Sequence, residues 1–269
     1  MLILILTFQA ASAKEVVRLS TGEWRPYVSE TEPDNGIMVQ ITKEAFALKG
    51  VEVDLGFFPW GRATQSSKNG DWDGTIALVR LTEREPFYLF SEPLYVGRYA
   101  FFHLKNVDFK WKDYTDLKNM TIASTIGFGG MGEDFIQAEK KGTIKVLRLG
   151  SDTQSFNMLM AKRADAVPSD VEVGYVLLRK LYGDKANQIT HDSEHYIVRS
   201  DYRLAISKKI KNGPALIAKF NEGLAQLRKS GRYDEILKTW YERPVYKDAV
   251  PMDFLIRPPA RGGLKNANR

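Results

Sequence analysis

The chain has 269 residues, 43% hydrophobic and 27% charged, a balance that argues against global disorder and suffices for a sizeable core in one or two domains. It contains no cysteine, which excludes disulfides, thiolate metal sites and a cysteine nucleophile. The net charge is +6, and the lysines and arginines are spread along the chain among 33 acidic residues. The sequence has no basic run with interleaved aromatic residues, as a nucleic-acid groove would need, so we expect no nucleic-acid partner.

The N-terminus has the features of an export signal. Met1 to Phe8 is apolar, and the small residues Ala11 and Ala13 that follow fit an A-x-A cleavage site. The run is too short to span a bilayer, which needs roughly 20 residues. We therefore predict that residues 1–13 are a signal peptide, without the usual positively charged start, and that the protein is periplasmic.

The first part of the chain alternates between strand-like and helix-like runs, which is typical of an α/β fold with largely parallel sheets. Val51, Val53 and Leu55 show the alternation of a strand, and Gly70 ends a short helix. We predict strands at 16–20, 51–55 and 75–79, and helices at 36–48 and 61–69.

A second unit of the same kind begins after residue 117. We predict strands at 120–125, 144–149 and 164–167, and helices at 131–140, 153–163 and 171–181. The last unit has a strand at 202–207, a helix that starts at Gly213-Pro214, and a final helix at 233–241. Residues 246–269 end in a basic segment rich in Pro, Gly and Asn, which predicts a flexible tail.

Two apolar stretches are expected to be structured connections between these units. They are Tyr95 to Leu104 and Tyr202 to Ile206, and neither has the composition of a flexible linker. Two such crossing strands imply that the chain leaves one lobe, builds a second, and returns. We therefore predict a discontinuous lobe 1 (14–100 and 202–245) and a lobe 2 (101–201).

Six segments resemble, in the expected order, the family 3 periplasmic solute-binding proteins, which are polar amino-acid receptors of ABC importers. The segments are Gly22-Glu-Trp-Arg-Pro-Tyr27, Gly70-Asp-Trp-Asp73, Thr82-Glu-Arg84, Phe90-Ser91-Glu-Pro93, Arg163-Ala-Asp165 through Asp170, and Gly231-Arg-Tyr233 through Trp240. The resemblance implies a two-lobed α/β fold of the type II periplasmic-binding-protein kind. It also implies a monomer that binds a small polar ligand and meets an ABC permease of the inner membrane.

Arg84 is the candidate for the carboxylate of such a ligand. A guanidinium has the planar fork that suits bidentate recognition of a carboxylate. The competing interpretation is a surface arginine beside Glu83 and Glu85. The T-x-R spacing here is one residue shorter than the T-x-x-R of the resembled family, so Arg80 is an alternative carboxylate partner.

Asp170 is the matching candidate for the ammonium group, because a zwitterion taken out of water needs both charges paired. Its alternative role is the N-cap of the helix that starts at residue 171. Trp60, Trp24 and Tyr27 are candidates for aromatic walls around the ligand side chain, and core packing is the alternative for each.

The segment from Gly127 to Gly132 follows a predicted strand and opens a helix. It satisfies G-x-G-x-x-G, with Asp152 about 20 residues on, but its place inside the second lobe speaks against a dinucleotide site. The resemblance implies instead that backbone N–H groups at Gly127 and Phe128 face the ligand carboxylate. The family often has Ser or Thr where this chain has Phe128. We expect no cofactor, and His103, His191 and His195 lack metal-binding spacing.

These observations predict a binding protein, not an enzyme, that captures an amino acid or related metabolite by hinge closure and delivers it to an ABC importer. Two alternatives stay open. One is a periplasmic enzyme of the cyclohexadienyl dehydratase type, with Glu23 or Asp170 as general acid. The other is a ligand-sensing periplasmic partner protein without a transport role.

Overall fold

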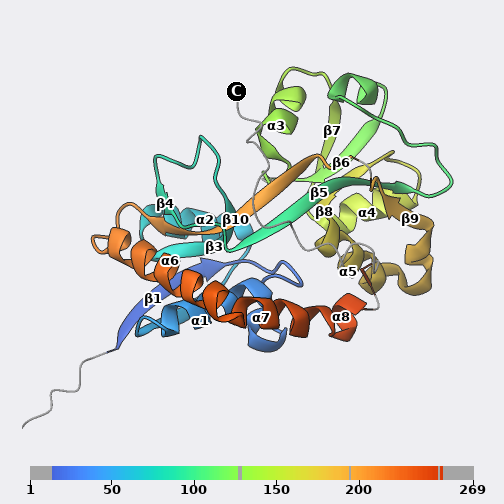
Figure 1. Ribbon diagram of the computed structural model, residues 1–269. Coiled ribbons are helices and arrows are strands. Elements are labelled where there is room, and N and C mark those ends of the chain that lie inside the picture. The colour runs from blue at the N-terminus through green and yellow to red at the C-terminus, as the bar shows by residue number, and fades with distance from the viewer. Residues whose placement is uncertain (1–13, 127–128, 194, 248, 251–269) are drawn as a thin grey trace, which may run out of the picture.

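The computed structural model describes residues 14–126, 129–193, 195–247 and 249–250 (Figure 1). The predicted signal peptide, residues Gly127 and Phe128, and the segment after residue 250 therefore lie outside the described residues. Figure 1 shows two groups of strands and helices joined by two long strands, β5 (Tyr95–Leu104) and β10 (Val198–Ser207). The predicted two-lobed α/β architecture is confirmed. Lobe 1 here means β1–β4 with α1, α2, α6 and α7; lobe 2 means β6–β9 with α3–α5, and the bounds of these elements follow.

Lobe 1 is built on a parallel three-stranded core. Its elements are β1 (Glu15–Thr21), the 3-10 turn η1 (Pro33–Asn35), α1 (Ile37–Ala47), β2 (Val51–Phe57), α2 (Trp60–Asn69), β3 (Gly74–Val79) and β4 (Tyr88–Phe90). Strand β1 lies in the middle, where Leu19 pairs with Leu55 of β2 and with Gly74 of β3. The predicted strands and helices agree with these bounds to within one or two residues; β4 was not predicted.

Lobe 2 repeats the alternation on a smaller scale. Its elements are η2 (Tyr114–Leu117), β6 (Thr121–Thr125), α3 (Gly132–Lys140), β7 (Lys145–Leu149), α4 (Asp152–Met160), β8 (Val167–Asp170), α5 (Val171–Tyr182), η3 (Gly183–Gln188) and β9 (Ile189–His191). The strand predicted at 164–167 begins at Val167 instead, because it pairs there with β5, with Asp170 opposite Tyr99. Ala166 makes only an isolated bridge to Ile122.

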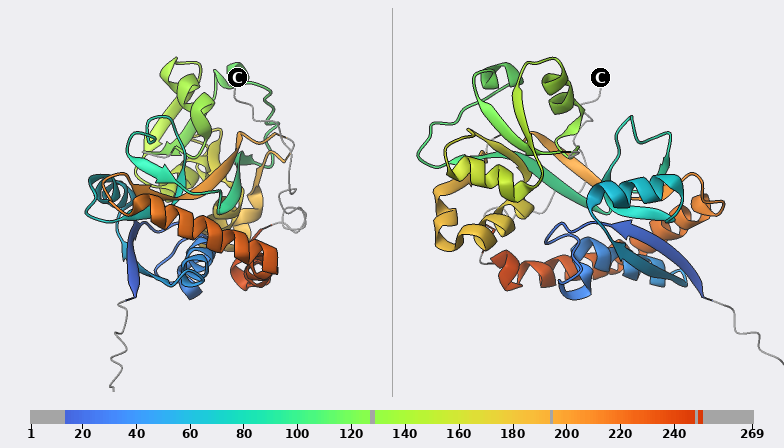
Figure 2. Two further views of the ribbon diagram at one scale, coloured as in Figure 1. Left: turned by 60° about the vertical axis from the view of Figure 1, so that its left-hand side comes forward. Right: turned by 180° about the vertical axis from the view of Figure 1, so that it is seen from behind.

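The two lobes are joined by β5 (Tyr95–Leu104) and β10 (Val198–Ser207), which run antiparallel to each other. Tyr202 of β10 lies opposite Tyr95 on one side and opposite Val79 of β3 on the other. The hydrogen-bonded order β2-β1-β3-β10-β5-β8 therefore passes without a break from one lobe to the other. The rear view in Figure 2 shows both crossing strands between the two groups of helices.

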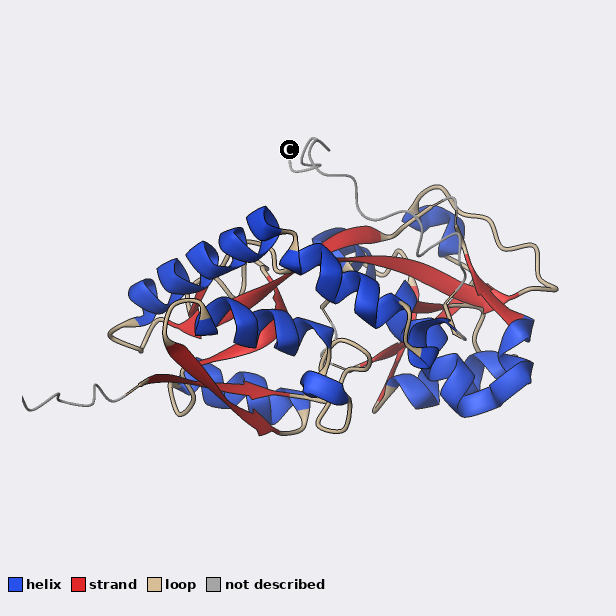
Figure 3. Cartoon of the chain, turned by 60° about the horizontal axis from the view of Figure 1, so that its bottom comes forward, coloured by secondary structure: helices blue, strands red, loops and turns tan. Residues whose placement is uncertain are grey.

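The C-terminal helices cover lobe 1 and then reach lobe 2. Helix α6 (Gly213–Ser230) packs on α1, and a Cβ at Gly223 would lie only 2.0 Å from the Ala45 carbonyl oxygen, so this close approach needs glycine. Helix α7 (Arg232–Tyr241) is followed by the short helix α8 (Pro244–Lys247), which contacts both α7 and α5 (Figure 1). Figure 3 shows helices (blue) packed around the strands (red) in both lobes. Tyr246, where we expected the tail to start, is fully buried.

None of the helices in the described ranges combines the length and the apolar character needed to cross a bilayer.

Candidate functional site

Asp170 lies at the boundary between the lobes, at the end of β8 and the start of α5. Its Oδ1 accepts hydrogen bonds from the backbone N–H groups of Glu172 (3.1 Å) and Val173 (3.3 Å). These are the bonds of a helix N-cap, which is the alternative role predicted for this residue. The side chain is almost wholly enclosed, with 1% of the residue surface exposed.

Two tyrosine hydroxyls complete the shell of the Asp170 carboxylate. Tyr27, in the loop between β1 and α1, donates to Oδ1 at 2.7 Å, and Tyr202 of β10 donates to Oδ2 at 2.9 Å. Burial raises the pKa of Asp170 above its usual range, although the two tyrosine and two backbone hydrogen bonds act to lower it. The carboxylate is therefore costly to ionise and well supplied with donors.

Glu172 is a second buried acid, two residues further along α5, which the sequence did not identify. Its Oε1 accepts a hydrogen bond of 2.7 Å from Tyr95, whose hydroxyl also lies 2.9 Å from that of Tyr241. Burial, and then the nearby charge of Asp170, raises the pKa of Glu172. Its only sequence signal is a lone acid in the first turn of a helix that is otherwise uncharged up to Leu178.

The predicted aromatic residues form one cluster against this shell. The Trp24 ring lies edge-on to Tyr27 (centroids 5.1 Å apart), Tyr202 (5.0 Å) and Trp60 (6.5 Å). Tyr27 is fully buried and Trp24 is 8% exposed, so both serve as core residues in this closed arrangement. Trp60 is only partly buried and donates from Nε1 to the Glu23 carbonyl oxygen at 3.1 Å. Among the three, Trp60 is the best placed to form a wall.

Arg84 lies on the lobe 1 side of the boundary, in the turn after β3. Among the described residues its guanidinium has one hydrogen bond, from Nη1 to the Val79 carbonyl oxygen at 3.0 Å. A Cβ at Gly129, in the lobe 2 loop, would lie 3.3 Å from Nη2, so the guanidinium faces the other lobe. Burial lowers the pKa of Arg84, but an arginine stays charged in proteins. Within the part of the chain that the structure describes, a cation with spare donors therefore lies between the lobes.

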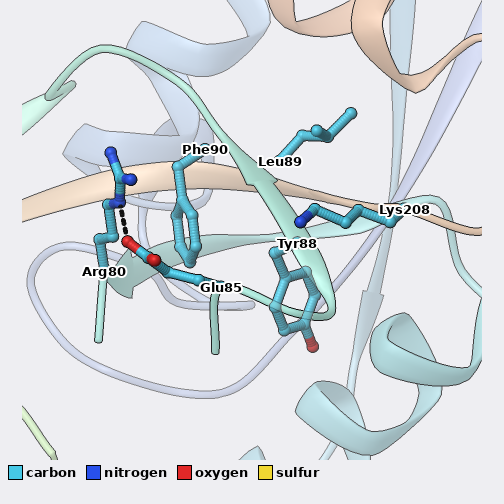
Figure 4. A pocket seen from close by; sticks show the side chains of 6 residues that line it. All are labelled: Arg80, Glu85, Tyr88, Leu89, Phe90 and Lys208. Carbon is cyan, nitrogen blue, oxygen red and sulfur yellow. Dashed lines mark hydrogen bonds and ion pairs between the residues drawn. The ribbon is translucent and has the colours of Figure 1, made fainter. Parts of the chain in front are cut away.

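Arg80 takes a different position from Arg84. Its Nε pairs with Glu85 Oε1 at 2.7 Å, and 58% of its side chain is exposed. With Glu85 it lines a cavity of about 240 Å³ on lobe 1, which is completed by Tyr88, Leu89, Phe90 and Lys208 (Figure 4). The two candidate arginines are thus separated, and only Arg84 faces the lobe 2 loop.

The glycine-rich loop of lobe 2 rests on the crossing strands. Gly127 and Phe128 lie outside the described residues, but the loop continues at Gly129 and Gly130. A Cβ at Gly130 would lie 2.2 Å from the Tyr99 hydroxyl oxygen, and the Gly130 carbonyl accepts a hydrogen bond of 2.7 Å from Ser200. This packing holds Gly129 close to Arg84 and Gly130 against Tyr99 of β5.

Comparison with known proteins supports the resemblance seen in the motifs. Residues 18–243 match the family described as bacterial extracellular solute-binding proteins, family 3. A mutant of ArgBP from T. maritima is 25% identical, with a TM-score of 0.69 over 85% of this chain and 96% of that one. No curated protein sequence matches the chain.

Two other solved structures share the fold at lower identity. A histidine kinase sensor domain with similarity to periplasmic binding proteins is 18% identical, with a TM-score of 0.70 over 85% of this chain and 97% of that one. An ancestral amino acid-binding protein, a precursor of cyclohexadienyl dehydratase, is 21% identical, with a TM-score of 0.66 over 84% and 96%.

Proposed function

Since this chain belongs to family 3 of the bacterial extracellular solute-binding proteins, we propose that it captures an amino acid or related metabolite between its two lobes. We take the lobes as residues 14–100 with 202–245, and residues 101–201. The ligand class follows from the two charged groups at the boundary, Arg84 and Asp170. Each is a chemically suitable partner for one end of a zwitterion.

The observation that carries the proposal is the position of Arg84. Its guanidinium is half-buried, faces Gly129 of lobe 2, and uses one of its five N–H donors on Val79. A carboxylate in this place would neutralise the cation and take up donors in a fork that matches its own geometry. The backbone N–H groups at Gly127 and Phe128 are proposed as additional donors to the same carboxylate.

The proposed mechanism is hinge closure around β5 and β10. When the lobes part, Asp170 on lobe 2 becomes accessible to an ammonium group while Arg84 on lobe 1 holds the carboxylate. Only the closed form pairs both charges, so the ligand shifts the equilibrium toward closure. Trp60, together with Trp24 and Tyr27, would contact the ligand side chain.

Export and delivery complete the proposal. Residues 1–13 would direct the chain to the periplasm, and a permease of the ABC type would recognise the closed form. The chain would act as a monomer, because the binding site is made by two lobes of the same chain.

Calorimetric titration with the common amino acids tests the ligand and the site together, after a thermal-shift screen identifies the best binder. Arg84→Ala should weaken affinity at least 100-fold, because a charge-assisted bidentate contact is lost. Arg84→Lys should recover only part of it, since a lysine offers a point charge and no fork. Arg80→Ala, its matched neighbour, should change affinity less than about threefold. The reverse order of effects would move the carboxylate site to Arg80.

An enzymatic role has one observation in its favour, the raised pKa of Asp170, which would suit a general acid. Glu23, the other candidate acid, is less suitable: burial acts to raise its pKa, but hydrogen bonds from Ser29, Arg25 and the Glu30 backbone outweigh it and lower the pKa. Because Asp170 is enclosed by its four donors, we expect no turnover of prephenate or arogenate. Release of phenylpyruvate or phenylalanine, followed by absorbance or chromatography, would establish the dehydratase alternative.

A further inference from the structure

We propose that the Tyr27 hydroxyl is a built-in competitor for the ammonium site on Asp170, which holds the lobes shut when no ligand is present. A ligand must displace this hydroxyl to bind, so Tyr27 sets both the affinity of the site and its demand for a charged ammonium group. The inference rests on the proposed function, and it names a residue that governs specificity at that site.

The hydrogen bond between these residues joins the two lobes directly. Tyr27 belongs to the loop after β1 in lobe 1, and Asp170 caps α5 in lobe 2. The 2.7 Å bond between them links positions 143 residues apart. The Tyr27 backbone carbonyl accepts from the Met38 N–H at 3.0 Å, which fixes the loop to the start of α1. The hydroxyl is therefore positioned by lobe 1 as a rigid group.

The other donors to Asp170 lie on α5 itself or on a strand that joins the two lobes. The N–H groups of Glu172 and Val173 belong to the same helix as the carboxylate, and Tyr202 lies on the crossing strand β10. Tyr27 is the one donor of these four that lies neither on α5 nor on a crossing strand. Opening the hinge would thus vacate one place on the carboxylate, and that is the place an ammonium group could take.

Gly97 lies against the second oxygen of the carboxylate, Asp170 Oδ2. A Cβ at this position of β5 would lie 2.3 Å from Asp170 Oδ2 and 2.4 Å from Tyr202 Cε2. The strand backbone therefore lies directly against Oδ2, and a ligand group cannot approach from that direction. A ligand is therefore expected to reach Asp170 at Oδ1, the oxygen to which Tyr27 donates.

Competition follows from the strength of the two contacts. An ammonium bonded to a carboxylate is a charge-assisted pair with charges on both partners, whereas a phenol supplies a neutral donor. The ammonium group can therefore displace the Tyr27 hydroxyl from Asp170. The apparent affinity of the ligand is still reduced, because the hydroxyl holds a fraction of the chains shut. A neutral donor on the ligand would gain little over Tyr27. Loss of one hydrogen bond to a charged group corresponds to a change of about 10- to 100-fold in the equilibrium between shut and open forms.

The absence of cysteine makes the test direct. Asn69→Cys on α2 and Lys140→Cys on α3 place one exposed label site on each lobe, and the distance between two spin labels then reports lobe separation. Without ligand, the otherwise unchanged chain should give one short distance. Tyr27→Phe should add a population at longer distance, and an amino acid should abolish that population. The affinity for the amino acid should rise about 10- to 100-fold.

Tyr202→Phe is the matched comparison, because it removes from the same carboxylate a hydroxyl that comes from the crossing strand β10 and bonds Oδ2, not one from the loop after β1. It should keep the single short distance. Asp170→Asn is a second way to weaken the link; it should open the lobes as Tyr27→Phe does, without closure by the amino acid. Thermal unfolding verifies that each variant is folded.

Identical distance distributions for Tyr27→Phe and the unchanged chain would overturn the proposal, as would a lower affinity in the Phe variant. If the Tyr27→Phe chain opens but neither it nor the unchanged chain binds any amino acid, Tyr27 keeps its role of holding the lobes shut and the proposed ligand class is overturned. The two ideas can therefore fail separately.

Discussion

Replacement of Gly97 by alanine tests how closely β5 is packed against the buried acid. The added Cβ would lie 2.3 Å from Asp170 Oδ2, 2.4 Å from Tyr202 Cε2 and 2.6 Å from the Tyr202 hydroxyl oxygen. All three distances are far below ordinary contact, and Asp170 is held by its helix N-terminus, so Tyr202 is the group that must move. Its 2.9 Å hydrogen bond to Oδ2 would then be lost.

The expected cost has two parts. Overpacking of a dense core costs about 1–3 kcal/mol, and a buried carboxylate that loses a donor costs about 1–3 kcal/mol more. The lower chain entropy of alanine in the unfolded state returns about 0.4–1 kcal/mol. We therefore expect Gly97→Ala to lower the free energy of unfolding by about 1–5 kcal/mol, measured by urea titration with tryptophan fluorescence.

Gly61→Ala is the matched control, because a Cβ at that position of α2 would meet nothing within 4 Å. It should leave stability unchanged or raise it by about 0.5–1 kcal/mol, the usual gain from alanine inside a helix. A loss of less than 1 kcal/mol in Gly97→Ala would refute the reasoning, since it would mean that Asp170 and Tyr202 have room to spare.

Two further substitutions probe other parts of the core. Burial, and then the charge of Asp170, raises the pKa of Glu172, so the native chain binds more protons than the unfolded chain and the free energy of unfolding should fall as the pH rises from about 4 through the raised native pKa. Glu172→Gln should reduce this fall, measured by urea titration at about pH 5 and about pH 8; an unchanged slope would contradict the assignment. Gly223→Ala should cost about 1–3 kcal/mol by forcing α6 away from the Ala45 carbonyl oxygen, and a neutral effect would show that the two helices can separate freely.

The fold was largely predictable because apolar periodicity decides where its elements lie. The alternating Val51, Val53 and Leu55 became β2, and the aromatic stretch Tyr95 to Leu104 became β5 with the same bounds. The strand expected at 164–167 lies at 167–170 instead, because its position depends on pairing with β5 and not on its own composition. β8 includes the polar Asp170, which periodicity alone would assign to a turn.

The site was less predictable because its contacts join distant parts of the chain. The capping role of Asp170 could be predicted, since it depends on neighbours in sequence. The bond from Tyr27 to Asp170 spans 143 positions, and no local pattern signals it. Glu172 was missed because an acid in the first turn of a helix is ordinarily a solvated residue that favours the helix dipole. Its burial depends on Tyr95 and Tyr241, which other elements supply.

The position of α8 restricts how far the hinge can travel. Helix α7 is packed on α1, while α8 inserts Tyr246 beside the buried Glu172 of lobe 2 and against the Tyr241 ring at 5.3 Å. The C-terminal turn is therefore a third tether between the lobes, in addition to β5 and β10. A wide opening of the lobes would have to expose the buried Tyr246 ring, whereas a small rotation could move α8 together with α5. Removal of the chain from residue 244 onward should therefore let the two lobes open wider than they do in the intact protein.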